Sequence, residues 1–337
     1  MNTDKPRLDL DPCEFVKIRG KLNLISLVQL GTVDYATGLR LQQQLVDLRK
    51  EEKIGDVLLL LEHSPVITLG RNAKAANVIA SPELLAQRGV ELFECDRGGD
   101  VTFHGPGQIV GYPIFDLRNF ARGAADASSA PRKTLGAVEF VRRLEEVLIR
   151  TCADFTIPTK RVPGLTGVWT DAGGHKAHVG TAASAVQRSE ASQPTNDREG
   201  HDFSRAEKGP KREPASAAEV NSAEAKLAAI GVHISRSVTS HGFALNVNTD
   251  LSYFNLIIPC GITARPVTSM QQELGKALDL NAVAESISRN FGTVFSSQML
   301  WVETLDALLG RTVGVPMELP IELRRLHGYD DKGIHRA

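Results

Sequence analysis

The sequence predicts an α+β fold, and three observations lead to that prediction. Candidate strands occur in pairs, without the regular strand–helix alternation that is typical of doubly wound α/β proteins. A small number of amphipathic helices separate those pairs. No internal repeat divides the 337 residues, and this length is large for one domain without requiring two. We therefore expect mixed sheets flanked by helices within a single domain.

The first expected elements are a helix and a buried strand. Residues 33–50 have apolar side chains at helical spacing and end in Arg and Lys, which suit a helix C-terminus. Residues 57–63 (VLLLLEH) form a continuous apolar run, as buried strands do. Residues 81–89 predict a short helix, because Ser81 can cap its N-terminus and Gly89 can end it.

The middle and the second half of the chain predict further strand pairs and helices. A Gly-rich turn followed by strands is expected where turn residues alternate with β-formers, and helices are expected where apolar residues recur at helical spacing. The expected elements are a turn–strand–turn–strand unit at 97–117, a helix at 133–152, strands beginning at 167 and 226, a strand and turn at 240–251, and mostly helix at 270–309.

The segment around residues 172–224 differs in composition from the rest of the chain. It is rich in Ala, Ser, Glu, Lys, Arg and Pro, and it has too few large apolar side chains to offset the entropy of ordering. We expect a disordered insertion there, within a catalytic domain at 21–309. Residues 1–20 are expected to be a poorly ordered lead and residues 310–337 a C-terminal extension.

Composition excludes several classes of function. The formal net charge is −1, so nothing global favours nucleic acid or a membrane surface. The N-terminal residues lack the apolar core of a signal peptide, and no apolar run reaches the length of a membrane helix. The four cysteines are far apart and form no zinc-type spacing, which fits a reducing compartment. We expect a cytoplasmic protein without a metal or another cofactor.

Two residues could form a nucleophilic unit. Cys260 follows an apolar run and is flanked by Pro259, which fixes the entry to a turn, and Gly261, which permits close approach of a substrate. Lys226 begins an apolar segment, and its ammonium could lower the pKa of a neighbouring thiol. Without a catalytic role, Cys260 would be a buried, unreactive cysteine and Lys226 a solvated surface lysine. His241 remains an alternative to Lys226 as the partner of the cysteine.

Small residues and turns mark two candidate binding stretches. Arg97 precedes two glycines, which indicates a flexible turn that bears a cation and whose backbone N–H groups can receive a carbonyl oxygen or an anion. His104 follows on a strand, where it is either a positioning residue or a hydrogen-bonded structural histidine. Gly242 and Ala244 would leave space on one strand face, although ordinary strand packing explains small residues equally well. Neither Gly-rich nucleotide-binding motif is present.

Taken together, these segments resemble the lipoyl(octanoyl) transferase family. The resemblance rests on GRNAKAANVI, RGGDVTFHGPGQIVGYPIFDLR, KLAAIGVHISR, TSHGFALNVNTDLSYFNLIIPCGI and TSMQQELG, in this order, from about residue 22 to about 305 with the insertion excluded. The family implies a fold like the catalytic domains of lipoate and biotin protein ligases. It also implies transfer of octanoate from acyl carrier protein to an enzyme cysteine, and then to a lysine of a lipoyl domain in a 2-oxoacid dehydrogenase or in the glycine cleavage H protein.

The resemblance also implies roles for particular residues. Cys260 in the PCGI motif corresponds to the nucleophile, and Lys226 to the lysine that lowers its pKa. The substrate-binding stretches correspond to Arg97, Gly98, Gly99, Asp100, Val101, Thr102, Phe103 and His104, to Ala229, Ile230 and Gly231, and to Gly242, Phe243 and Ala244.

The sequence departs from the family pattern at the insertion and in the tail. Lys176, in the stretch GGHKAHVG, is a decoy for Lys226, but only KLAAIGVHISR matches the family beyond the lysine. His175 and His178 without a third ligand are a poor zinc site. Two alternative functions remain at this stage: an ATP-dependent lipoate or biotin ligase, against which the PCGI motif argues, and a non-catalytic module that binds lipoyl domains.

Overall fold

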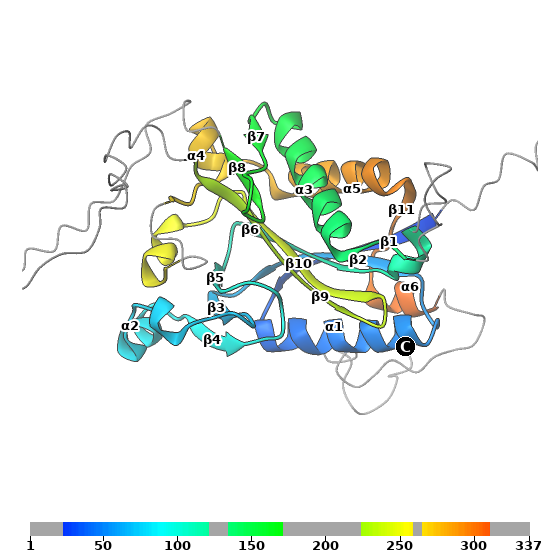
Figure 1. The fold of residues 1–337 in the computed structure, drawn as a ribbon, viewed down its shortest axis with the longest axis horizontal. Helices are drawn as coiled ribbons and strands as arrows, with labels where there is room; N and C mark the ends of the chain where they lie inside the picture. Colours follow the sequence, from blue (N-terminus) through cyan, green and yellow to red (C-terminus); the bar gives the residue numbers. More distant parts are fainter. Residues whose placement is uncertain (1–22, 121–133, 171–223, 259–264, 311–337) are drawn as a thin grey trace, which may run out of the picture.

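The computed structural model describes residues 23–120, 134–170, 224–258 and 265–310. Within them the chain forms a large mixed sheet, a small sheet, and helices on both faces of the large sheet (Figure 1). This arrangement confirms the α+β class that the strand pairs predicted. In the described part of the chain, no helix combines the length and the apolar character needed to cross a bilayer.

The large sheet has eight strands in the order β11-β1-β2-β6-β10-β9-β8-β7. Strands β11, β1 and β2 run parallel to one another, and each further neighbour is antiparallel. The strands are β1 (Asn23–Val33), β2 (Asp56–His63), β6 (Gln108–Ile114), β7 (Thr159–Lys160), β8 (Val168–Thr170), β9 (Lys226–Ser235), β10 (Val238–Asn246) and β11 (Ser297–Trp301).

Each face of the large sheet is covered by helices. Figure 1 shows α3 (Ala137–Asp154) and α5 (Leu280–Phe295) above the sheet and α1 (Tyr35–Lys50) below it. The α3/α5 face encloses a core rich in phenylalanine, in which Phe291 and Phe295 stack with centroids 5.4 Å apart. The α1 face, which α6 (Leu305–Gly310) extends, encloses an aliphatic core. Strands β6 and β10 contribute side chains to both cores, so they are fixed at the centre of the molecule.

A small three-stranded sheet lies beside the large one and has its own apolar cluster. Its order is β4-β3-β5, with β3 parallel to β4 and antiparallel to β5. Helix α2 begins as expected, because the Ser81 side chain accepts the Leu84 N–H and Pro82 occupies the first turn. The bounds are β3 (Val66–Leu69), η1 (Ala75–Asn77), α2 (Pro82–Gln87), β4 (Glu91–Glu94), β5 (Val101–His104), η2 (Leu117–Phe120), η3 (Leu251–Leu256) and α4 (Met270–Leu274).

Two strands at one edge of the large sheet differ from the expectation. Residues 270–309 were expected to be mostly helical, yet Ser297–Trp301 is a strand that pairs in parallel with β1. Strand β1 itself was not assigned from the sequence, because polar residues such as Gln29 and Thr32 interrupt its apolar pattern. Both strands are defined by long-range pairing, which a local pattern does not carry.

Candidate active site

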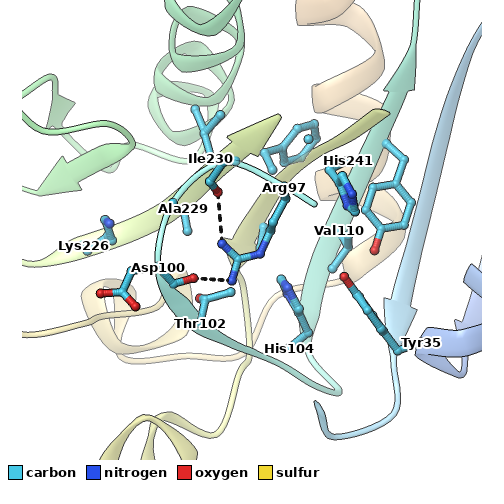
Figure 2. Close-up of a pocket in the computed structure, with 17 residues that line it drawn as sticks. Tyr35, Arg97, Asp100, Thr102, His104, Val110, Lys226, Ala229, Ile230 and His241 are labelled. Atoms are coloured by element: carbon cyan, nitrogen blue, oxygen red, sulfur yellow. Dashed lines mark hydrogen bonds between the residues drawn. The ribbon is translucent and has the colours of Figure 1, made fainter. Parts of the chain in front are cut away.

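A pocket lies between strands β6, β9 and β10 of the large sheet and the turn that leads into β5 (Figure 2). It contains about 520 Å³ of space, including its open mouth. Its lining consists of Tyr35, Arg97, Gly98, Gly99, Asp100, Thr102, His104, Val110, Tyr112, Lys226, Ala229, Ile230, Gly231, His241, Gly242, Phe243 and Ala244.

The structure brings most of the expected binding residues to this pocket. Twelve of the fourteen line it, and so does Lys226. Val101 and Phe103 are the two that do not, because alternate residues of β5 face opposite sides. Their side chains pack in the core of the small sheet, where Phe103 stacks on Tyr253. Cys260 lies outside the described residues.

Arg97 holds the glycine turn rigidly, whereas the sequence indicated a flexible turn that presents a cation. Its guanidinium donates to the Thr68 carbonyl and to the Asp100 carbonyl, each at 2.7 Å, and also to the Gly98 carbonyl at 3.1 Å. The residue is buried, at 8% exposure. The arginine is therefore used to bind backbone carbonyls, so the turn is preorganised before any substrate arrives.

The turn also packs directly on strand β9. The Gly98 N–H donates to the Val232 carbonyl at 3.1 Å, so this amide is not available to an oxyanion as the sequence had suggested. A Cβ on Gly231 would lie 2.5 Å from the Gly98 oxygen, so only glycine permits this approach. The Gly99 N–H has no partner among the residues that the structure describes.

Gly242 is required for strand packing as well as lining the pocket. A Cβ at this position would lie 2.1 Å from the carbonyl oxygen of Gly111 on the neighbouring strand β6. The space that Gly242 was expected to leave for a ligand is therefore largely filled by backbone. Ala244, at 4% exposure, lines the pocket and also contributes to the aliphatic core.

One end of the pocket is cationic. The ammonium of Lys226 lies 4.9 Å from the centre of the Trp169 ring, and the guanidinium of Arg265 lies 5.5 Å from the same ring. Arg265 and Lys160 both form ion pairs with Glu224. Glu224 was expected to be the last residue of the insertion, but here it belongs to this charged cluster.

The opposite end contains aromatic rings in a fixed arrangement. His63 Nδ1 lies 2.7 Å from the Val33 carbonyl, and its Nε2 lies 2.6 Å from the Tyr112 hydroxyl. A carbonyl only accepts, so Nδ1 carries the proton, Nε2 accepts, and the Tyr112 hydroxyl donates. Burial lowers the pKa of His63 to about 4 and raises the pKa of Tyr112, so both side chains are neutral at neutral pH.

His104 is fixed by a similar chain of hydrogen bonds. The Gln108 amide group donates to the Phe103 carbonyl and to the Asn246 Oδ1, so its own oxygen points to His104 Nδ1 at 2.8 Å. His104 Nδ1 is therefore the donor. Burial, reinforced by His63 and Arg97, lowers the pKa of His104 to about 3. The imidazole is therefore neutral. The sequence allowed either a positioning residue or a structural histidine, and these contacts are those of a hydrogen-bonded structural histidine.

His241 has a strained backbone, with φ of 55° within strand β10. Its N–H is satisfied by the Gln42 side chain from helix α1 at 2.7 Å, and its Nε2 lies 2.7 Å from Asp96 Oδ1. Asp96 also approaches His233 at 2.9 Å. Non-glycine residues in this backbone region cluster at functional sites. Burial lowers the pKa of His241, against the opposing effect of Asp96.

Four lining residues escaped the sequence prediction of the binding stretches, namely Tyr35, Val110, Tyr112 and His241, as did His63 behind them. His241 had been considered only as a partner for the cysteine. A usable signal was present for two of the others, because His63 ends the apolar run VLLLLEH and Tyr112 interrupts the buried strand QIVGYPI. Polar aromatic residues within fully buried strands need designated partners.

Comparison with solved structures defines the class of the fold. A bi-partite lipoate protein ligase from Thermoplasma acidophilum superimposes with a TM-score of 0.51 at 12% identity, over 86% of this chain and 91% of that one. LipL1 of P. falciparum in complex with lipoate gives a TM-score of 0.51 at 10% identity, over 94% and 76%. The expected resemblance of the fold to lipoate protein ligases is confirmed. The chain has the fold of this class.

Sequence relatives specify the family. Residues 34–292 match the model of the lipoyl protein ligase A/B catalytic domain. An octanoyltransferase from Koribacter versatilis is 53% identical over 307 residues, which is 91% of this chain and 98% of that protein. An octanoyltransferase from Acidobacterium capsulatum is 49% identical over 288 residues, 85% of this chain and 96% of that one. The chain belongs to the octanoyltransferases of this family, which are acyltransferases.

Proposed function

We propose that this octanoyltransferase carries the octanoyl group as a thioester on Cys260, with Lys226 stabilising the thiolate. The donor is octanoyl-acyl carrier protein. The acceptors are lysines of lipoyl domains, as in 2-oxoacid dehydrogenases and the glycine cleavage H protein. The observation that carries the proposal is the position of Lys226 at the cationic end of a preformed pocket with an apolar lining.

The chain on both sides of Cys260 is hydrogen-bonded to the pocket. Two residues before it, the Ile258 N–H donates to the carbonyl of Asn77, whose side chain binds Asp100 at 2.6 Å. Beyond it, the segment 266–268 pairs with Lys226, which donates to the Pro266 carbonyl at 2.8 Å. Residues on both sides of Cys260 in the sequence are therefore anchored beside the pocket, and this anchoring supports the proposal.

The electrostatics of the cationic end favour an anion there. Lys226 and Arg265 share the Trp169 ring, and Arg265 is paired with Glu224. A positive charge near a thiol stabilises the thiolate and lowers the thiol pKa. Lys226 is therefore suited to activate the thiol and to return a proton to the leaving thiol.

The reaction balances in two steps. In the first, the Cys260 thiolate attacks the carbonyl carbon of the carrier thioester, the C–S bond to the carrier breaks, and the carrier thiol leaves with a proton from Lys226. In the second, the acceptor amine attacks the enzyme thioester, loses a proton to Lys226, forms an amide and releases the Cys260 thiolate. One thioester replaces another in the first step, so ATP is not required.

The oxyanion formed in both steps requires hydrogen-bond donors. The Gly98 amide is bonded to Val232, so the neighbouring Gly99 amide is the better donor within this turn. Its conformation is fixed by Arg97, whose guanidinium bonds the carbonyls on either side. A donor that is held in place before the reaction gives the largest electrostatic benefit.

The test is to mix the protein with octanoyl-acyl carrier protein, without ATP, and to measure the intact mass. We expect a single octanoyl adduct that hydroxylamine removes and that Cys260→Ser abolishes. Cys152→Ser is the matched control, since Cys152 is buried and burial raises its pKa to about 12, and it should retain the adduct. An adduct on another cysteine, or a strict need for ATP, would contradict the proposal.

A further inference from the structure

The end of the pocket remote from Lys226 is built from aromatic side chains of four different elements. Tyr35 comes from α1, His104 from β5, Tyr112 from β6 and His241 from β10, and all four line the pocket. Figure 2 shows Lys226 on one side of the pocket, Arg97 in the middle, and Tyr35, His104 and His241 on the other side. We call these four residues the aromatic wall.

The rings of the aromatic wall support one another. Tyr35 lies parallel to His104 with centroids 6.2 Å apart, and Tyr112 meets His241 edge to face at 6.5 Å. His63 lies behind them and contacts Tyr35 at 5.1 Å and Tyr112 at 5.8 Å. None of the four wall residues exceeds 7% exposure. Displacement of one ring would require the others to move.

Three of the four wall residues have a polar atom that is bound to a protein group. The Tyr112 hydroxyl donates to His63, His104 Nδ1 bonds Gln108, and His241 Nε2 bonds Asp96. A buried polar group that already has its partner costs little beside an apolar ligand. The wall can therefore receive the end of an alkyl chain against its ring surfaces while these three bonds stay intact.

We propose that the aromatic wall is the specificity element of the enzyme: it stops the acyl chain at its methyl end and so sets the chain length that is transferred. This inference rests on the proposed function, in which the carboxyl end of the chain is held at the Lys226 end. An aliphatic wall would yield to a longer chain by changing rotamers. Rings that are locked by hydrogen bonds and mutual packing do not, because close-packed interiors resist added methylenes.

Tyr35 is the residue to change, because its ring lines the pocket and lies parallel to that of His104, so its loss removes one whole face of the wall. Tyr35→Leu removes the ring and opens the wall. We expect the ratio of decanoyl to octanoyl adduct, measured by intact mass with equal amounts of the two acyl carrier proteins, to rise about tenfold. This factor corresponds to the free energy gained by burying the two additional methylenes of the decanoyl chain, at about 0.8 kcal/mol each.

Phe93→Leu is the matched control. Phe93 packs against Tyr35 with centroids 5.3 Å apart but does not line the pocket, so the ratio should not change. Tyr35→Phe keeps the ring and should retain the wild-type ratio. Tyr35→Met, which retains more apolar volume, replaces Tyr35→Leu if thermal unfolding shows that the latter is not folded, and it too should raise the ratio.

The outcomes separate the two proposals. Equal ratios for the unchanged protein and for a folded Tyr35→Leu or Tyr35→Met variant, with adduct present on both, would overturn the aromatic wall as the specificity element. An equal rise in Phe93→Leu would overturn it as well, since general loosening would then explain the effect. Absence of an octanoyl adduct from the unchanged protein would overturn the proposed function instead.

Discussion

The two ends of the pocket are built on opposite principles. At the Lys226 end, two cations share the Trp169 ring, and one of them is paired with Glu224. At the far end the aromatic wall is buried, and its histidine at position 104 is kept neutral by burial. Charged side chains are concentrated at one end, whereas at the other end Tyr112, His104 and His241 are hydrogen-bonded to protein groups.

In the proposed function, the cationic end carries out the chemistry and the far end selects the acyl chain. A thioester exchange requires a stabilised thiolate and mobile protons, so it benefits from charged groups near solvent. An alkyl chain requires a surface that is uncharged and rigid. Between the two ends, the turn that Arg97 holds adjoins strand β9 at Gly231. We expect loss of the Lys226 charge to change reaction rates, substitution of a wall residue to change selectivity, and crowding of His63 behind the wall to change stability.

The largest effect is expected from removing the charge of Lys226. Lys226→Met keeps an apolar side chain of similar length but removes the ammonium, so the pKa of the Cys260 thiol should rise by about one unit or more. The rate of Cys260 alkylation by iodoacetamide near neutral pH should then fall about tenfold. The alkylated Cys260 peptide, quantified against pH by mass spectrometry, measures this change.

Lys160→Met is the matched control at the same end, since Lys160 pairs with Glu224. Its alkylation profile should follow that of the unchanged protein. Lys176→Ala, in the decoy stretch, should also have no effect. If Lys176→Ala slowed alkylation and Lys226→Met did not, the assignment of the lysine would be wrong and the cationic end would not be the catalytic one.

The second prediction concerns the neutrality of the far end. The pKa of folded His63 is lowered to about 4 from 6.5, so the unfolded chain binds the proton more readily. The contribution of neutral His63 to the free energy of unfolding is therefore fully present above about pH 6.5, and it is lost as the pH falls toward 4. His63 alone should reduce the free energy of unfolding by about 2 kcal/mol between pH 7.5 and pH 5. Urea unfolding at the two pH values measures the loss.

His63→Gln is the comparison, because glutamine does not titrate in this range. The variant should be less stable at pH 7.5, since the bonds to Val33 and Tyr112 are altered. Between pH 7.5 and pH 5, the free energy of unfolding of this variant should fall by about 2 kcal/mol less than that of the unchanged protein. An identical pH dependence would show that His63 is not held neutral, and the contrast between the two ends would lose its electrostatic basis.

Local patterns in the sequence predicted the strand pairs and the glycine turn, whereas most of the lining residues were named through the resemblance to the family. The alternation of β5 brings Thr102 and His104 to the pocket and sends Phe103 away, which period-2 reasoning could have anticipated. Gly231 was identified by resemblance, and its physical cause, the approach of Gly98, is visible only in the structure.

The aromatic wall could not be assembled from the sequence, because it depends on contacts between distant residues. Tyr35 and His241 are separated by 206 positions (241 − 35), and their common neighbour Tyr112 lies on a third element. The direction in which Arg97 points was also misjudged, since an arginine beside glycines suggests a free cation. Only the positions of the Thr68 and Asp100 carbonyls show that it is bound internally.

The smallest predicted effect tests whether the wall is supported from behind. Gly38 lies within helix α1, where alanine would ordinarily stabilise the helix by about 1 kcal/mol. A Cβ at this position would lie 2.8 Å from His63 Cε1, and His63 supports Tyr112. We expect Gly38→Ala to lower the free energy of unfolding by about 1 kcal/mol or more, because packing strain outweighs helix propensity.

Gly55→Ala is the control, because a Cβ there would meet nothing within 4 Å. It should be neutral or stabilise by a few tenths of a kcal/mol through the unfolded state. If Gly38→Ala were as stable as Gly55→Ala, helix α1 or His63 would have moved to accommodate the added methyl group. The position of His63 would then not be fixed by packing. If the support behind Tyr112 is rigid, Gly38→Ala lowers the free energy of unfolding whereas Gly55→Ala does not. Chemical denaturation of both variants measures this difference.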